Sequence, residues 1–259
     1  MLKYFSIAGL ILAGILLFFK ARKFRSILYL GIFYFTVSLY GYDQYVLLFS
    51  KSVFLVSCFF VHSTFTFYLI GPMLYWYIRS TLTDNSLLKK HDFWHLIPLL
   101  VYLAAALPYI FAPWSYKVGI ASCIVDDPGF MGRFNATILS EIFSNTAVYL
   151  SRPVLVFGYT IMAFVLFIRY IREQKNLGVL SGQLYMIRWL SVFLGFQMIL
   201  ITSYLFAVFV AFTASPDVFF GINFIQVLSA VGMTGLLVSP FFFPGILFGL
   251  PRVPDSYLK

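Results

Sequence analysis

Polar side chains inside long apolar stretches are the residues of this chain that could do chemistry. A charged or amide group in hydrocarbon is costly unless it has a partner or a function. Groups of this kind, gathered toward one end of a helical bundle, indicate a polar cavity that holds a small ligand. The candidate ligand-binding residues are Asp43, His62, Arg152, Gln197, Tyr204, Asn223 and Gln226.

These residues also have a structural interpretation, in which they hydrogen-bond one another across helix interfaces. His62 needs only one partner, such as Thr66 or Tyr204, to be a structural histidine. As a switch or a ligand contact, its charge change would have to favour one of two helix arrangements. For any single residue packing is the simpler explanation, whereas the set as a whole favours a binding site.

The sequence has none of the residue patterns that carry common enzyme chemistry. It contains no HExxH, no GxSxG, no phosphate-binding loop and no pair of carboxylates within one apolar stretch. His91 and His95, with Asp92 beside them, have the spacing of a metal pair, but no further ligand stands near them. A helix-capping role is favoured there. We therefore expect no enzymatic activity, no metal and no cofactor.

Composition predicts a membrane protein. Of the 259 residues, 61% are hydrophobic and 10% charged, and the mean hydropathy is +0.92, which is far outside the soluble range. Seven apolar stretches are long enough to cross a bilayer as helices. The predicted fold is all-α, a polytopic membrane protein with seven transmembrane helices. They are expected at residues 3–19, 26–48, 52–78, 95–113, 147–171, 190–212 and 219–247.

Basic residues gather in every second gap between these stretches. The positive-inside rule assigns such gaps to the cytoplasm, which places the amino terminus outside and the carboxyl terminus inside. The net charge of +9 then lies on the inner face of the cytoplasmic (inner) membrane, against anionic lipid. We expect no direct nucleic-acid contact by this chain. Thirteen of the 18 basic residues are inside: Lys20, Arg22, Lys23, Arg25, Arg79, Lys89, Lys90, Arg169, Arg172, Lys175, Arg188, Arg252 and Lys259.

Residues 114–146 form a long segment on the outer side and are expected to fold over the outer mouth as a lid. Cys123 lies in this segment, and Cys58 lies about two turns into the third stretch from its outer end. A disulfide between them is geometrically possible on that side of the membrane. Two unpaired thiols are the alternative, and the sequence favours it somewhat.

Three local strings resemble a known family. They are GPMLYWYIRS at 71–80, HDFWHLIPLLVYL at 91–103 and FFFPGILFGLPR at 241–252. Together they resemble the membrane portion of AraC-type regulators of Bacteroidota, in which a seven-helix sensor precedes a cytoplasmic helix-turn-helix domain. The resemblance implies a sensor that passes an outer signal to transcription. Residues 1–250 would be the sensor domain and 251–259 a cytoplasmic linker stub.

The sequence differs from the family in one respect. It stops at Lys259, where the family's DNA-binding domain would begin. We expect either the sensor portion of a longer regulator or a free-standing protein that acts through a cytoplasmic partner. A homodimer is also possible. Pro240 and Pro244, near the inner end of the last helix, are the expected relay, because a kink there converts helix rotation into movement of the tail.

Two further functions stay open at this stage. A small-molecule transporter is suggested by prolines and polar residues within spans, although seven helices do not divide into equal halves. A membrane scaffold without a ligand would have a fully packed interior whose polar groups all pair with one another. Ligand binding without transport would distinguish a sensor from both.

Overall fold

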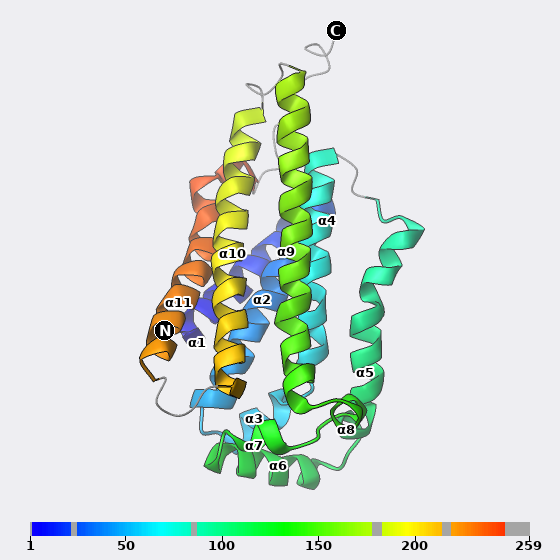
Figure 1. Cartoon of the computed structure of the whole chain (residues 1–259), viewed down its shortest axis with the longest axis vertical. Helices are drawn as coiled ribbons and strands as arrows, with labels where there is room; N and C mark the ends of the chain where they lie inside the picture. Colours follow the sequence, from blue (N-terminus) through cyan, green and yellow to red (C-terminus); the bar gives the residue numbers. More distant parts are fainter. Residues whose placement is uncertain (1, 22–24, 84–86, 178–182, 214–218, 247–259) are drawn as a thin grey trace.

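The chain folds as a bundle of helices, and the part that the structure describes has no strand (Figure 1). The computed structural model describes the backbone of residues 2–21, 25–83, 87–177, 183–213 and 219–246, and their side chains except at 20, 210–226 and 246. The label η marks a 3-10 helix, or a π-helix in η1. The elements are α1 (Leu2–Ile15), η1 (Leu16–Lys20), α2 (Arg25–Phe49), α3 (Val53–Phe59), η2 (Thr64–Leu69), α4 (Ile70–Thr83), η3 (Lys90–Leu96), α5 (Ile97–Ile110), α6 (Trp114–Asp126), α7 (Phe130–Arg133), α8 (Ile138–Ile142), α9 (Asn145–Asn176), α10 (Leu184–Thr213), α11 (Phe219–Phe242) and η6 (Pro244–Ile246).

Long helices run side by side along the bundle, and the short helices α3, α6, α7 and α8 gather at one end (Figure 1). We call α6 to α8 the cap, and this end of the bundle the cap end. Helix α9 packs between α4 and α10, α10 packs on α11, and α2 packs on both α1 and α4. The opposite end holds the last turn of α4 and the start of η3.

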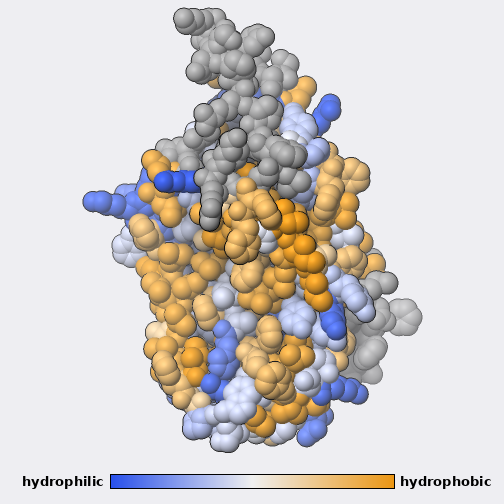
Figure 2. All heavy atoms as spheres, turned by 180° about the vertical axis from the view of Figure 1, so that it is seen from behind, coloured by the Kyte–Doolittle hydropathy of each residue, from blue (hydrophilic) through white to orange (hydrophobic). Residues whose placement is uncertain are grey.

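Four helical segments are long and apolar enough to cross a membrane: Leu2–Phe19, Lys90–Ile110, Asn145–Asn176 and Leu184–Phe209. The bent pair of α3 with Thr64–Thr83 makes a fifth if it counts as one crossing. The described apolar part of α11, Val227–Phe242, is shorter. Figure 2 shows apolar side chains over much of the face seen from behind, as a lipid-embedded bundle requires.

The expected third span, 52–78, is not one continuous helix. Helix α3 ends at Phe59, the next helical residues begin at Thr64, and the two parts are bent by 47°. Val61, at this break, has a φ of 68°, which is a strained conformation for a β-branched residue. The sequence gives no sign of this break, because no proline or glycine occurs in FFVHST.

The segment predicted to fold as a lid, 114–146, contains the three short helices α6, α7 and α8. A buried cluster joins the cap to the ends of α2, α3 and α9 through residues such as Val46, Val56, Ile120, Ile124 and Val148. Thr137 and Ser140 form a capping box at the start of α8. The cap is therefore a packed part of the bundle end.

The larger core lies between α1, α2, α4, α9, α10 and α11, and Phe33, Leu74, Trp189 and Phe193 are fully buried in it. In lipid, helix association depends on close packing rather than on escape from water. Gly71 allows one such close approach, since a Cβ there would lie 2.3 Å from Cδ2 of Tyr159 on α9. The glycine thus brings α4 and α9 into contact.

Pro240 leaves one carbonyl in α11 without its helical donor. A proline has no N–H, so it cannot bond the oxygen of Leu236 four residues earlier. Tyr34 Oη on α2 donates to this oxygen at 2.7 Å, and Ser239 Oγ donates to it at 2.9 Å. The hydroxyl of Tyr34 therefore joins α2 to α11 by a hydrogen bond beside the proline.

Candidate functional site

A small polar cavity lies under the cap, where α2, α5, α9 and the α3–η2 break meet. Asp43 comes from α2 and Arg152 from α9, whereas Val61 comes from the break and Thr64 from the start of η2. The cavity is also lined by Tyr102 of α5, by Tyr149 and Asn145 of α9, and by Phe134, Thr137 and Ser140 of the cap. Two of the predicted ligand-binding residues, Asp43 and Arg152, are thus brought together.

Asp43 is buried, with 2% of its surface exposed. Its Oδ1 accepts a hydrogen bond from Ser63 Oγ at 2.8 Å, and Ser63 lies in the break between α3 and η2. No hydrogen bond to Oδ2 is made by the described residues. A buried carboxylate normally uses both oxygens, so Oδ2 leaves one acceptor available at the cavity.

Arg152 is also buried, at 8% exposed. Its Nη2 donates to Tyr102 Oη at 3.3 Å, and the guanidinium lies 5.3 Å and 4.7 Å from the ring centres of Tyr102 and Tyr149. The Nε atom is buried and has no hydrogen-bond partner among the described residues. The two aromatic rings stabilise the cation, but part of its hydrogen-bonding capacity is unused.

Asp43 and Arg152 line the same cavity, yet no ion pair joins them in the part of the chain that the structure describes. Two opposite charges removed from solvent usually meet directly, because each is costly to bury alone. Here both groups line one cavity without such a contact. The arrangement can accept a species that contacts both groups.

The cavity is small. The volume open to the centre of a water molecule is about 20 Å³, which is room for one or two waters. Small-molecule pockets are commonly at least ten times larger. The described conformation is therefore too tight for anything larger than water, and a ligand needs the residues around the cavity to move apart.

Asn145 holds the cap in this position. Its Nδ2 donates to the carbonyl of Gly132 in α7 at 3.0 Å, and to Oδ1 of Asn135, between α7 and α8, at 3.1 Å. Asn145 is the first residue of α9, seven residues before Arg152 on the same helix, and it lines the cavity itself. A shift of α9 would therefore act on the cap and on Arg152 together.

His62 does not line this cavity. It lies in the break between α3 and η2, where its Nδ1 is 3.0 Å from the carbonyl oxygen of Phe60 and its ring packs on Tyr109 at 5.7 Å. These contacts are the partners that a structural histidine needs. No hydrogen bond between the described residues joins His62 to Thr66 or Tyr204, and the Thr66 hydroxyl donates to Ser63 O instead.

Gln197 and Tyr204 are on α10, apart from the cavity lining. Gln197 is 1% exposed and its Oε1 has no described partner, whereas Tyr204 packs edge-on against Tyr40 with ring centres 5.0 Å apart. Asn223 and Gln226 belong to α11, but their side chains lie outside the described residues. These four positions stay predictions.

Cys58 and Cys123 are both free thiols, so the possible disulfide between α3 and α6 is not formed. Cys123 is exposed on the cap, whereas Cys58 is partly buried, which favours the alternative of two unpaired cysteines.

The proposed relay prolines lie within and just after the last turn of α11. Pro240 is followed by two more helical residues, and Pro244 starts η6, where Gly245 N–H donates to Tyr185 Oη at 2.9 Å. Residues 251–259 lie outside the described part.

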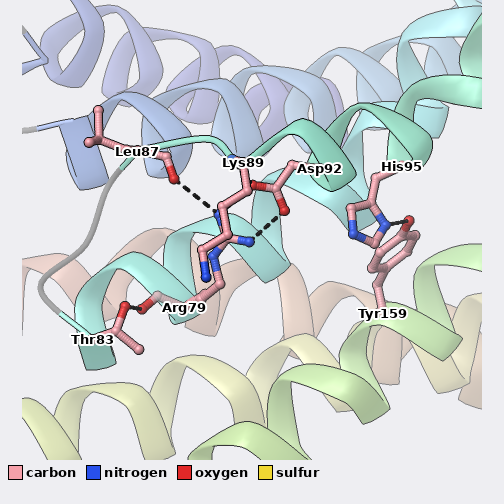
Figure 3. Close-up of polar contacts among 7 residues, drawn as sticks. All are labelled: Arg79, Thr83, Leu87, Lys89, Asp92, His95 and Tyr159. Atoms are coloured by element: carbon pink, nitrogen blue, oxygen red, sulfur yellow. Dashed lines mark hydrogen bonds and ion pairs between the residues drawn. The ribbon is translucent and has the colours of Figure 1, made fainter.

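A second Arg–Asp pair, which the sequence did not single out, lies at the opposite end (Figure 3). Arg79 of α4 donates to both oxygens of Asp92, at 2.5 and 2.7 Å, and Asp92 Oδ2 also accepts the N–H of Lys89 at 2.6 Å. Nearby, His95 Nδ1 is 2.6 Å from Tyr159 Oη. We call Arg79, Asp92, His95 and Tyr159 the clamp. It joins α4, η3 and α9. The capping contact at the start of η3 is made by Asp92, whereas the sequence pattern favoured that role for His91 and His95.

Sequence reasoning missed three residues that line the cavity, Thr64, Tyr102 and Tyr149, and also Ser63, which donates to Asp43. Hydroxyl-bearing residues are common in spans, so their types carried no signal. Arg152 and Tyr149 stand three apart, a spacing that places both on one helix face and could have suggested a cation–aromatic contact.

Comparisons with protein families, with characterised proteins and with solved structures found no match to this chain. Its class is therefore defined by fold and composition, as an all-helical protein with several membrane-compatible helices, and its site by the geometry of the cavity.

Proposed function

We propose that this chain is the sensor module of a membrane receptor, which binds a small ligand on the outer side and relays its presence to cytoplasmic transcriptional control. In this proposal the chain crosses the inner membrane seven times, with its amino terminus outside. The supports are the uneven distribution of basic residues and the membrane-compatible helices. The cap end then faces outward, and the clamp end faces the cytoplasm.

The observation that carries the proposal is the pair of opposite charges buried in one cavity without direct contact. A scaffold would gain nothing from it, because leaving charged groups incompletely paired in a low-dielectric interior lowers stability. In a receptor the same two charges have a use, because a bound ligand can provide the missing partner of each. The strained backbone at Val61, which also lines the cavity, is the kind of outlier that clusters at binding sites.

Helix α2 provides a direct connection from the cavity to the exit of the last helix. Asp43 is at the cavity, and Tyr34, nine residues earlier on the same helix, bonds the Leu236 carbonyl that Pro240 leaves without a helical donor. At about 1.5 Å per residue the two positions are about 13 Å apart along the axis. If a ligand binds Asp43 more tightly in one packing of the bundle than in another, it favours that packing. Helix α2 would then shift, and with it the part of α11 near Pro240 and Pro244.

A transporter is the second candidate, and the broken third helix favours it. Transporter sites are commonly formed by interrupted helices whose backbone lines a cavity, and the α3–η2 break lines this one. The two functions differ in one consequence. A transporter must open the cavity to both sides, whereas a receptor needs only to change shape when the ligand binds.

The test uses the full chain in lipid nanodiscs and a panel of small polar solutes, with the melting temperature as readout. We expect at least one solute to stabilise the wild-type chain and not the Arg152→Gln variant. The same solute should not accumulate in proteoliposomes. Accumulation with counterflow that Gln197→Ala or Asn223→Ala diminishes would replace the receptor with the transporter. No stabilisation by any solute would favour the scaffold.

Topology is checked separately with reporter fusions at both chain ends. We expect the amino-terminal reporter outside and the carboxyl-terminal reporter in the cytoplasm. Both reporters on one side would exclude an odd number of crossings and with it the proposed orientation.

A further inference from the structure

We infer that the ligand of the cavity is a small zwitterion, a molecule with one carboxylate and one ammonium group. Arg152 would bind the carboxylate, and Asp43 would bind the ammonium. This inference rests on the proposed binding function of the cavity and names its ligand class. It follows from the two unused hydrogen-bonding groups at the site and from the balance of charge.

The unused groups are of opposite kinds. Nε of Arg152 is a buried donor with no described partner, and Oδ2 of Asp43 is an acceptor with none. A guanidinium binds a carboxylate through two parallel N–H donors, and its Nε with one terminal nitrogen can form such a fork. An ammonium group donates to carboxylate oxygens and to hydroxyls, and Thr64 also lines the cavity.

Charge balance disfavours singly charged ligands. An anion bound by Arg152 would meet the carboxylate of Asp43 in the same small space, and a cation bound by Asp43 would meet the guanidinium. Such repulsion is strong in a low-dielectric interior. A zwitterion provides an opposite charge for each group and leaves the net charge of the site unchanged.

Size limits the ligand further. The cavity has room for one or two waters, so even the smallest amino acid requires the surrounding residues, including those of the cap, to move apart. The cap is attached near the site by the hydrogen bonds of Asn145 to Gly132 and Asn135. Small members of the class are expected to bind best, since each added side-chain atom demands a larger opening.

The experiment titrates the full chain in nanodiscs with glycine, L-alanine and β-alanine, and with two matched probes that each lack one charge. Glycinamide has no carboxylate, and N-acetylglycine has no ammonium. We expect at least one free zwitterion to bind and to raise the melting temperature, and both blocked probes to fail at the same concentration. Calorimetry gives the affinity.

Two variants test the assigned contacts. Arg152→Gln and Asp43→Asn should each weaken binding of the zwitterion about 100-fold, the loss expected for one charge-assisted contact in a buried site. Arg133→Gln is the matched control, because Arg133 is an exposed cap cation that pairs with Asp127 and should leave affinity unchanged. If Arg152→Gln does not fold, Arg152→Lys keeps the charge, lacks the planar fork and should still weaken binding.

The outcomes separate the ligand class from the receptor. Binding of another solute at this cavity, without any response to the three zwitterions, overturns the ligand class and leaves the receptor. Zwitterion binding with accumulation in proteoliposomes overturns the receptor and leaves the ligand class. Equal binding by the blocked probes, or unchanged affinity in both cavity variants, overturns the inference.

Discussion

The two ends of the bundle each contain a largely buried aspartate and arginine, and they use them differently. In the clamp, Arg79 donates to both oxygens of Asp92, and the backbone N–H of Lys89 donates a further hydrogen bond to the same carboxylate. Under the cap, Asp43 and Arg152 line one space without an ion pair, and Nε of Arg152 has no described partner. The same two residue types thus form a fully hydrogen-bonded ion pair at one end of the bundle and two incompletely bonded charges at the other.

The difference shows why charge content alone does not identify a binding site. A paired and hydrogen-bonded charge has little to offer a ligand, because binding would first break existing contacts. A buried charge with unused donors has already lost its hydration when the chain folded. A ligand that hydrogen-bonds these donors therefore gains free energy without a further desolvation of the charge. The cavity is therefore the better candidate, although the clamp has the shorter distances.

The largest effect is expected from breaking the clamp. Arg79→Met leaves Asp92, whose side chain is 5% exposed, with only the Lys89 N–H as partner. The free energy of unfolding should fall by about 3 kcal/mol, measured by denaturation in mixed micelles. Lys90→Met is the control at an exposed neighbouring cation, and it should change stability by less than about 0.5 kcal/mol. A similar small change for Arg79→Met would remove the contrast between the two ends.

A smaller loss is expected where α4 meets α9. Gly71→Ala places a methyl group against the ring of Tyr159, which the clamp holds through His95, and should cost about 2 kcal/mol. Gly158→Ala on α9 is the matched control, since a Cβ there meets no atom within 4 Å. It should be neutral or slightly stabilising, because alanine favours helix over glycine. Equal behaviour of the two variants in the same assay would contradict the close approach.

Tyr34→Phe should have a milder effect. The substitution removes the hydroxyl of α2 that donates to the Leu236 carbonyl. This carbonyl still accepts a hydrogen bond from the Ser239 hydroxyl. We therefore expect the free energy of unfolding to fall by about 1 kcal/mol. Tyr40→Phe on the same helix is the control, because the Tyr40 hydroxyl has no described partner. If the two substitutions cost the same, the α2–α11 bond does not stabilise the bundle and is a poor relay.

Much of the helical content is predictable from apolar stretches, since the expected helices at 26–48 and 147–171 correspond to α2, Arg25–Phe49, and α9, Asn145–Asn176. The break at Phe60–Ser63 is not predictable. Its residues are apolar or common in helices, and the left-handed backbone of Val61 depends on packing around it. Seven crossings and their orientation stay predictions.

The site is predictable only in part. Asp43 and Arg152 stand out because each is a charge within an apolar stretch. That they share one cavity depends on how α2 and α9 pack, which residue types do not encode. Gln197 and Tyr204 have equally suggestive side chains, yet they lie on α10 outside the cavity lining. The clamp could have been anticipated, because Arg79 and Asp92 flank one short connection with opposite charges.

The most direct test of the contrast is the stability of the double variant Asp43→Asn with Arg152→Met, without any added solute. Replacing both charges of an incompletely paired buried set should leave the melting temperature equal to or above that of the wild-type chain, while response to the zwitterion panel is lost. A melting temperature well below wild type, as expected for Arg79→Met, would show that Asp43 and Arg152 hold the fold together and would contradict a cavity kept for a ligand.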